Sequence, residues 1–387
     1  MKILIVLTYY RPHISGLTIY AERIAQALAR RGHQVTVLTA QFDPKLPLKE
    51  TCEGVRVVRV PVLMRLSKGV IMPSFGRMAS RLVREHDVIQ LHLPQFDAAG
   101  VALRGRLRKK PTVITYHCDL ELPPGFFNRL ANLAVLMMND LAALFTHRIV
   151  TYTADYANHS AYTSRYMKKV KVIPPPVVLP AISTEQKQAF QQEHNPRGQR
   201  PVIGMAARFA TEKGVEVLLK AMPLVLEKYP QALFQFVGPY KNIIGEERYF
   251  EKLAPEIKKF EEQGNWKFLG SMSPVQMAAF YGNLDLLVVP SLNSTEAFGL
   301  VQIEAMMKGV RCITSNLPGV RQPVIVHRMG AIFPIGDSAA LAGGILNSLD
   351  HPEELHQANT DFSAYNPDSV AKIYEDLFEE IRSEIRP

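Results

Sequence analysis

The chain has 387 residues and a mass of 43.4 kDa, more than one ordinary domain needs and enough for two. Its hydrophobic content of 47% and charged content of 21% exclude a fibrous or largely disordered protein. Residues 1–200 contain 28 Lys and Arg against 13 Asp and Glu, whereas residues 201–387 contain 17 against 23. Two domains that meet different partners are therefore expected.

Strand-like runs alternate with helical periodicity along most of the chain, which is typical of a parallel sheet covered by helices on both faces. Lys2–Leu7 predicts a buried strand, followed by a loop containing Gly16, a helix, and a second strand over Gln34–Leu38. The same unit recurs about 200 residues later, with strands over Val202–Ala206 and Leu233–Val237. We therefore predict an α/β protein with two doubly wound, Rossmann-like domains that face each other across a cleft.

Composition also predicts where the domains divide. Val170–Val172 resembles the last strand of the first half, and the polar residues after Pro174-Pro175-Pro176 resemble a linker. An amphipathic pattern at the C-terminal end predicts a helix that crosses back to the first domain. The expected parts are a first Rossmann-like domain over residues 1–182, a linker over 183–199, a second Rossmann-like domain over 200–368 and a C-terminal helix over 369–387.

No apolar run reaches the roughly 18 residues that span a bilayer. The run Ile3–Leu7 is too short for the hydrophobic region of a signal peptide. Cys52, Cys118 and Cys312 form no CxxC pair, so neither a disulfide framework nor a structural zinc site is indicated. We expect a cytoplasmic protein.

Residues 285–309 form the most informative segment, with the pattern of a buried strand, a loop and a helix that begins at Gly299-Leu300. Glu296 lies in the loop and Glu304 in the second helical turn. At 100° per residue, their carboxylates fall about 80° apart and can face one cleft. The alternative is that Glu296 only starts the helix and Glu304 is a surface residue.

The start of this helix also offers unpaired backbone amides, which suit a phosphate group. They belong to Phe298, Gly299 and Leu300.

A second motif, Arg208 to Lys213-Gly214, follows a predicted strand and opens a helix. Two fixed cations five residues apart suit the charge that develops on a leaving diphosphate. The alternative is a pair of surface cations, one of them paired with Glu212.

These motifs occur in a fixed order: Gly16, His117, Arg208, Lys213-Gly214, Glu296-Ala-Phe-Gly-Leu and Glu304-Ala-Met. In this order the chain resembles the retaining glycosyltransferases of the GT-B fold, and more narrowly the "group 1" or family 4 set. The resemblance covers nearly the whole chain. It departs from the family at Ser15-Gly16-Leu17, where many relatives have paired glycines, and at Gln322, where an acid is common.

The resemblance implies roles for these residues. Glu296 would bind hydroxyls of the donor sugar and steady positive charge at the anomeric carbon, and Glu304 would hold the ribose hydroxyls. Arg208 and Lys213 would grip the diphosphate, assisted by the amides of residues 298–300.

The resemblance also implies contacts beyond these charged groups. Gly16 would let the backbone approach the phosphate or sugar, and the backbone at Ser271 and Met272 would lie near the base. His117 would contact the donor sugar from the opposite domain, unless it is a structural histidine. Asp119 is a candidate for acceptor contact, although a cap at the strand end is the interpretation we favour.

The sequence has no DxD pair set up to hold a metal, and this fold generally uses protein cations instead. We therefore expect metal-independent, retaining transfer of a hexose from a UDP- or GDP-linked donor, with no cofactor. The alternatives are a nucleotide-sugar epimerase or a phosphorylase of the same fold, or a non-catalytic scaffold that binds membrane or nucleic acid.

The acceptor is expected to lie against the basic first domain and to be lipid-linked or an anionic membrane component, with peripheral contact to the inner face of the cell membrane. Cations interleave with apolar residues from about residue 63 to 84, and no nucleic-acid-binding signature accompanies them. A strongly apolar helix follows Phe126-Phe127. That helix suits either a membrane surface or the core, of which we favour the core. The basic residues, in turn, are also compatible with a solvated surface.

Overall fold

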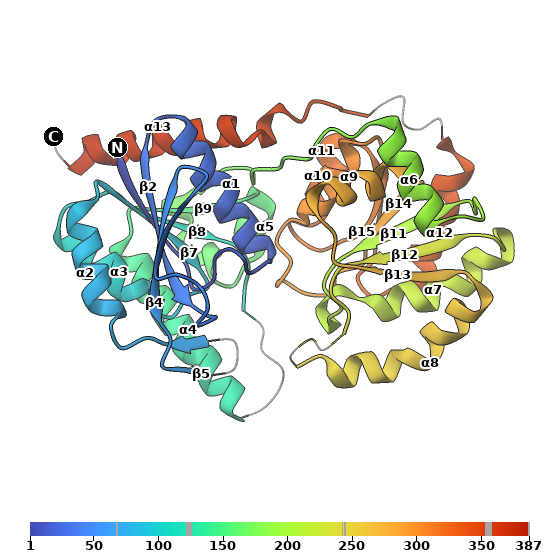
Figure 1. The fold of residues 1–387 in the computed structure, drawn as a ribbon, viewed down its shortest axis with the longest axis horizontal. Helices are drawn as coiled ribbons and strands as arrows, with labels where there is room; N and C mark the ends of the chain where they lie inside the picture. The colour runs from blue at the N-terminus through green and yellow to red at the C-terminus, as the bar shows by residue number, and fades with distance from the viewer. Residues whose placement is uncertain (67–68, 121–125, 242, 244, 353–357, 386–387) are drawn as a thin grey trace. The chain divides into compact units, whose positions relative to one another are not determined.

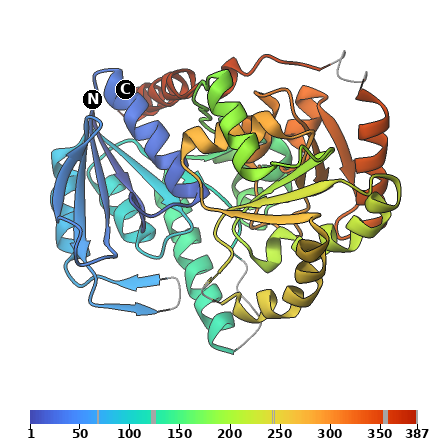
Figure 2. The same ribbon diagram turned by 45° about the vertical axis from the view of Figure 1, so that its right-hand side comes forward.

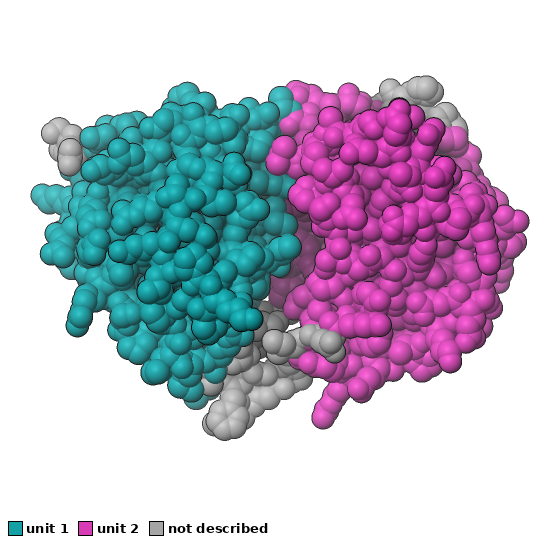
Figure 3. Space-filling view, viewed as in Figure 1, with its two compact units in different colours: residues 1–177, 363–387 teal, residues 178–362 magenta. Residues whose placement is uncertain are grey.

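The computed structural model of the chain describes residues 1–66, 69–120, 126–241, 243, 245–352 and 358–385, and its fold is drawn in Figure 1. These residues divide into two compact units: unit 1 holds residues 1–177 and 363–387, and unit 2 holds residues 178–362 (Figure 3). Unit 1 contains 28 Lys and Arg against 17 Asp and Glu, a formal charge of +11, whereas unit 2 contains 17 against 19. Lys68, within the predicted basic-apolar segment, and the side chains of Phe126-Phe127 lie outside the described residues.

Unit 1 is built on an eight-stranded sheet in which every pairing is parallel except that of the edge strand β3 with β4. The order places β1 between β2 and β7, which is the arrangement of a Rossmann sheet. From one edge to the other the strands are β10 (Val170–Val172), β9 (Arg148–Thr151), β8 (Thr112–Tyr116), β7 (Val88–Leu93), β1 (Lys2–Val6), β2 (Gln34–Gln41), β4 (Val55–Pro61) and β3 (Lys49–Cys52). Figure 2 shows β5 (Met64–Leu66) and β6 (Gly69–Ile71) as a separate ribbon.

The helices of unit 1 form two groups by their contacts. One group packs α2 against α3 and α3 against α4, and the other packs α1 against α13. Their bounds are α1 (Gly16–Arg30), α2 (Phe75–Glu85), α3 (Ala98–Leu107), α4 (Phe126–Phe145), α5 (Ala154–His159), the 3-10 helices η1 (Thr163–Lys169) and η4 (Ser363–Tyr365), and α13 (Pro367–Ile385). Ser15 and Thr18 form a capping box that starts α1.

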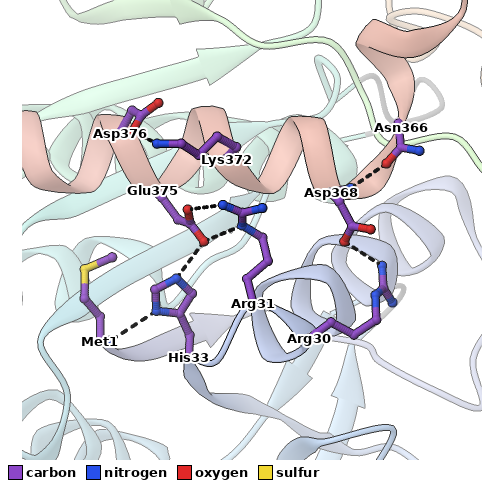
Figure 4. Close-up of polar contacts among 9 residues, drawn as sticks. All are labelled: Met1, Arg30, Arg31, His33, Asn366, Asp368, Lys372, Glu375 and Asp376. Atoms are coloured by element: carbon purple, nitrogen blue, oxygen red, sulfur yellow. Dashed lines mark hydrogen bonds and ion pairs between the residues drawn. The ribbon is translucent and has the colours of Figure 1, made fainter.

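The C-terminal helix α13 belongs to unit 1, as predicted, and lies beside α1 (Figure 4). Glu375 accepts two hydrogen bonds from Arg31, at 2.6 and 2.8 Å, and lies 2.8 Å from His33 Nε2. The hydrogen bond from Arg31 lowers the pKa of Glu375, and burial opposes that shift. Beneath these ion pairs Tyr374 is fully buried, so apolar packing and paired charges together hold the helix on the unit.

Unit 2 has a six-stranded, wholly parallel sheet of the same Rossmann order. The strands are β13 (Trp266–Gly270), β12 (Leu233–Val237), β11 (Val202–Ala206), β14 (Leu286–Val289), β15 (Arg311–Ser315) and β16 (Gly330–Phe333). The bounds of β11 and β12 match the predicted strands, because both are short, mainly apolar runs that become buried on both faces. Parallel sheets in both units confirm the predicted fold class.

The helices of unit 2 also pack in two groups. In one group α12 packs against α7 and α7 against α8. In the other, α6 packs against α9, α9 against α10 and α10 against α11. Their bounds are α6 (Thr184–His194), the 3-10 helix η2 (Thr211–Lys213), α7 (Val215–Lys228), α8 (Glu247–Gln263), α9 (Pro274–Asn283), α10 (Leu300–Met306), α11 (Gln322–His327) and α12 (Ser338–Asp350).

The stretch predicted as a linker, residues 183–199, instead contains helix α6. Ser183 and Gln186 form a capping box that starts the helix. Phe190 is buried at a ring-centroid distance of 6.5 Å from Phe280 of α9. Side chains of Lys267 and Asn283 also donate hydrogen bonds to carbonyls of α6, so apolar and polar contacts together attach this polar helix to unit 2.

Burial also differs from the sequence-based expectation in unit 1. Apolar members of the basic-apolar segment, such as Met72, Phe75 and Leu82, are buried and belong to the core. Conversely, α4, for which we favoured the core, exposes a row of large apolar residues. In the described part of the chain, no helix combines the length and apolar character needed to cross a membrane.

Candidate functional site

The strand order of unit 2 brings the two predicted motifs together. β11 and β14 are neighbours in the sheet. The chain continues from β11 to β12 on one side and from β14 to β15 on the other, so the strand order reverses between them. Ligands of doubly wound sheets bind where this reversal occurs, beyond the carboxyl ends of the strands. Arg208 and Lys213 follow β11, and Glu296 follows β14, so all three side chains lie at this reversal.

The Lys213 loop packs directly on the loop that follows β14. The amide of Leu292 donates a 2.9 Å hydrogen bond to the carbonyl of Glu212. Gly214 has a φ of +70°, and a Cβ atom there would lie 2.1 Å from the carbonyl oxygen of Pro290. Only glycine permits both this backbone conformation and this approach. The glycine after Lys213 therefore sets the position of the lysine.

Lys213 and Glu296 form an ion pair at 2.5 Å between Nζ and Oε2. The other carboxylate oxygen of Glu296 accepts a 3.0 Å hydrogen bond from the amide of Gly299. Burial favours the uncharged lysine, but the charge of Glu296 and its hydrogen bond outweigh burial and raise the pKa of Lys213. Both side chains remain about one-fifth exposed, so a ligand has access to this fixed pair of opposite charges.

Arg208 forms an ion pair with Glu212, four residues further along the chain. The sequence analysis named such an ion pair with Glu212 as the alternative to diphosphate binding by one of the two cations. The Arg208 side chain is 35% exposed, whereas that of Glu212 is 16% exposed. The guanidinium thus keeps an open side, from which it can also bind a diphosphate.

Two expectations about the loop before α10 are wrong. The amide of Gly299 is not unpaired, because it donates to Glu296. The backbone of Gly299 is left-handed, with φ +76°, and α10 begins only at Leu300, so helical periodicity does not relate Glu296 to Glu304. Gln302 anchors the loop instead, since its side-chain amide donates to the carbonyls of Phe298 and Val320 at 3.0 and 2.8 Å.

Glu304 lies in the second turn of α10, as predicted. Its carboxylate accepts a 2.9 Å hydrogen bond from the hydroxyl of Tyr281 in α9, and the residue is partly exposed. Ser271 and Met272 lie between β13 and α9; Ser271 is exposed and Met272 is half-buried. Their backbone is at the same edge of the sheet as the loops that follow β11 and β14.

Three predicted residues lie in unit 1. Gly16 is the first residue of α1 and not a loop residue, and a Cβ atom there would have no neighbour within 4 Å. Asp119 is buried, and its carboxylate accepts hydrogen bonds from Tyr116 at 2.9 Å and from Ser160 at 2.7 Å. These contacts favour the strand-end cap for Asp119 over acceptor binding.

His117 follows β8 and is buried in a chain of polar side chains. Its Nε2 lies 2.8 Å from His92 Nδ1, and its Nδ1 contacts the hydroxyl of Tyr152. Burial lowers the pKa of His92 to about 3. Burial and, secondly, the charge of His92 also lower the pKa of His117 well below its usual range. Both imidazoles are therefore neutral at pH 7.

Three partners of predicted residues escaped the sequence analysis: His92 and Tyr152 in unit 1, and Tyr281 in unit 2. Each stands next to a predicted residue in space but far from it along the chain, so no local spacing connects them. The only available signal was the presence of His92 inside an otherwise apolar strand, Val88–Leu93. Among the described residues, no group of three or more His, Cys, Asp and Glu side chains is placed to hold a metal ion.

Two protein-family models match the chain, one in each unit. Residues 186–362 match the family described as "Glycosyl transferases group 1", and residues 14–179 match the family described as "Glycosyltransferase Family 4". The two matches fall on unit 2 and unit 1 respectively and together cover most of the chain.

Curated relatives agree with this assignment. An uncharacterized glycosyltransferase of Methanocaldococcus jannaschii is 27% identical over 348 residues, covering 86% of this chain and 85% of the relative. The phosphatidyl-myo-inositol mannosyltransferase of Mycobacterium leprae is 25% identical over 338 residues, covering 86% of this chain and 83% of the relative.

Solved structures share the fold. The sucrose-phosphate synthase of Thermosynechococcus elongatus has a TM-score of 0.74 at 20% identity, over 99% of both chains. HepE of Anabaena, in complex with UDP-glucose, has a TM-score of 0.69 at 19% identity, over 100% of this chain and 98% of that chain. The two Rossmann units therefore define a GT-B protein. The chain belongs to the family 4 glycosyltransferases, which confirms the resemblance found in the sequence.

Proposed function

We propose that the protein transfers a hexose, with retention of anomeric configuration and without a metal ion, from a UDP- or GDP-linked donor to a hydroxyl of a lipid-linked or membrane-associated acceptor. The observation that carries the donor half is the Lys213–Glu296 pair at the sheet reversal of unit 2, with Arg208 in the same loop. HepE of Anabaena, which shares the fold, was solved with UDP-glucose, and that supports a nucleotide-sugar donor.

The charges suggest how the donor is held and activated. Lys213 and Arg208 would bind the diphosphate and stabilise the charge that it gains as the sugar leaves. Glu296, fixed by Lys213 and by the amide of Gly299, would face the sugar hydroxyls and the cationic anomeric carbon. Glu304 would bind the ribose. In a retaining reaction on one face of the sugar, the acceptor hydroxyl gives its proton to the departing phosphate oxygen, so no separate base is assigned.

Donor binding provides the test. We expect UDP- or GDP-hexoses to raise the melting temperature of the purified protein, since a ligand that binds only the folded state stabilises it in proportion to RT ln(1 + [L]/Kd). Transfer is then measured with the stabilising donor and phosphatidylinositol or another lipid with a free hydroxyl. Consumption of the donor without an acceptor, giving a second sugar nucleotide, would instead indicate an epimerase.

Exposed apolar residues on α4 support a membrane-bound acceptor. Leu130, Leu133, Met137, Leu141 and Leu144 are between 37% and 61% exposed. At 100° per residue they fall within an arc of about 80° on one side of the helix. The opposite side carries the buried Asn139, Ala142 and Ala143. We call these five exposed residues the α4 stripe.

A cation lies at the C-terminal end of the α4 stripe. Lys169 Nζ donates hydrogen bonds to the carbonyls of Ala143, Leu144 and Thr146, at 2.7, 3.2 and 2.9 Å. In α3, which packs against α4, and just after it, Arg106, Arg108 and Lys109 are exposed. With the +11 charge of unit 1, this arrangement suits an anionic bilayer, with leucines in the interface and cations at the headgroups. The lipid acceptor named for the Mycobacterium leprae relative is consistent with such a surface.

The variant Leu133→Glu/Met137→Glu is expected to bind vesicles containing phosphatidylglycerol at least about tenfold more weakly than the parent protein, because each glutamate places a charge in the bilayer interface. Binding of the parent should also fall as salt rises. The measurement is vesicle co-sedimentation. The matched control is Ile325→Glu/Val326→Glu, which changes two exposed apolar residues of unit 2. Equal binding by the two variants would remove the α4 stripe as the membrane surface.

A further inference from the structure

The polar chain around His117 joins four elements of unit 1 in its interior. His92 comes from β7, His117 follows β8, Tyr152 follows β9, and Tyr20 comes from α1. The ring of Tyr20 meets the edge of the His117 ring at a centroid distance of 5.0 Å and an interplanar angle of 89°. Its hydroxyl lies 2.7 Å from that of Tyr374 in α13. The His117 imidazole is thus enclosed by residues that are far apart in the sequence.

We propose that His92 and Tyr152 are positioning residues that hold the imidazole of His117 in one orientation and one tautomer, with its proton on Nε2. The inference rests on the proposed function, together with the contact between His117 and the donor sugar that the family resemblance implies. Both ring nitrogens are engaged inside unit 1, so the ring cannot turn without breaking two hydrogen bonds. A ring fixed in this way gives the sugar a preorganised contact surface.

The direction of the hydrogen bonds follows from donor and acceptor strength. Each neutral imidazole has one N–H and one acceptor nitrogen. A phenol is a better donor than acceptor, so the Tyr152 hydroxyl donates to Nδ1 of His117. Nε2–H of His117 then donates to Nδ1 of His92, and the proton of His92 resides on Nε2. The tautomer of His117 is therefore set by its partners, as is usual for histidines in functional sites.

One unfavourable feature argues against a purely structural role for this chain. His92 Nε2 is buried and has no hydrogen-bond partner among the described residues. A buried donor without a partner destabilises the folded state, whereas apolar side chains of similar shape in place of a hydrogen-bonded pair are often close to neutral. A core selected only for stability has no need of two histidines here. Their presence here is explained if the orientation of His117 matters for the reaction.

The variant Tyr152→Phe removes only the hydroxyl that binds Nδ1. We expect it to lower kcat/KM for the donor roughly tenfold, in line with the sensitivity of transfer reactions to small misplacements. We also expect it to convert His117 from a single Nε2–H tautomer to a mixture. The tautomer is read by NMR from 15N-labelled histidine, with the His117 signals assigned by their loss in His117→Gln. Replacing His92 with Leu should have the same effects, and His92→Asn, which keeps a polar atom near the Nδ1 position, should restore part of the activity.

The matched control is Tyr162→Phe. Tyr162 is also buried in unit 1, and its hydroxyl donates a 2.9 Å hydrogen bond to the carbonyl of Asn139. The two variants should lose similar melting temperature, but only Tyr152→Phe should change the tautomer and kcat/KM. An unchanged tautomer, or a kcat/KM equal to that of the control, overturns the proposal. Absence of transfer by the parent protein with every donor counts against the proposed function, while the tautomer measurement needs no turnover and still decides whether the chain holds His117.

Discussion

Replacing Lys213 with alanine is expected to lower kcat for sugar transfer by roughly 100- to 1000-fold, the range observed when one preorganised group that stabilises developing charge is removed. The variant loses a cation whose position is fixed by Glu296 and by the close packing of Gly214. It also leaves the Glu296 carboxylate without the cation that is paired with it. The measurement is steady-state kinetics at saturating donor, with melting temperature recorded in parallel.

Glu296→Ala should lower kcat by a similar factor, because it removes the carboxylate proposed to face the sugar and frees Lys213 from its position. The two side chains act as one unit, so the double variant should lose much less than the product of the single effects. Lys228→Ala is the control, since Lys228 also forms a 2.5 Å ion pair in unit 2, with Asp350, on an exposed surface. Parent-level kcat in Lys213→Ala would show that this pair is structural and that the donor binds elsewhere.

Much of the fold could be predicted because the central strands of the two sheets are local apolar signals. Strands such as Val202–Ala206 are buried on both faces, so their composition alone marks them. Helix α6 was missed because its sequence is polar, with Phe190 as its buried residue, and because the side chains that bind its carbonyls come from distant parts of unit 2. The exposure of α4 was also missed, because a row of leucines at helical spacing is the same pattern whether it faces the core or the surface.

The candidate site was also predictable only in part. Lys213 and Glu296 are 83 residues apart, yet the neighbouring positions of β11 and β14 brought them together as the motif order suggested. The partners that hold site residues could not be predicted, since Tyr281, His92 and Tyr152 occur in segments with no motif. Pairing between loops depends on strand order, which a single sequence determines only through the whole fold. The unpaired amide assigned to Gly299 was wrong for a related reason, because the nearest acceptor was the predicted Glu296 itself.

Gly214→Ala is expected to lower the free energy of unfolding of unit 2 by roughly 2–5 kcal/mol, through the left-handed backbone and the overpacking that a methyl group causes. The added Cβ atom would lie 2.1 Å from the carbonyl oxygen of Pro290, a contact that the backbone relieves only by moving the Lys213 loop away from the end of β14. Such a movement separates Lys213 from Glu296, so transfer should fall together with stability. Chemical denaturation and donor kinetics measure the two effects.

The variant Gly309→Ala separates the cost of the left-handed backbone from the cost of the close contact. Gly309 has almost the same backbone conformation, with φ +77°, but a Cβ atom there has no neighbour within 4 Å. This control should lose only the roughly 1–2 kcal/mol that a left-handed alanine costs, and it should keep parent kcat. The difference between the two variants then isolates the contact with Pro290. If Gly214→Ala loses no more stability than Gly309→Ala and transfers sugar at the parent rate, the close approach of these two loops does not set the position of Lys213.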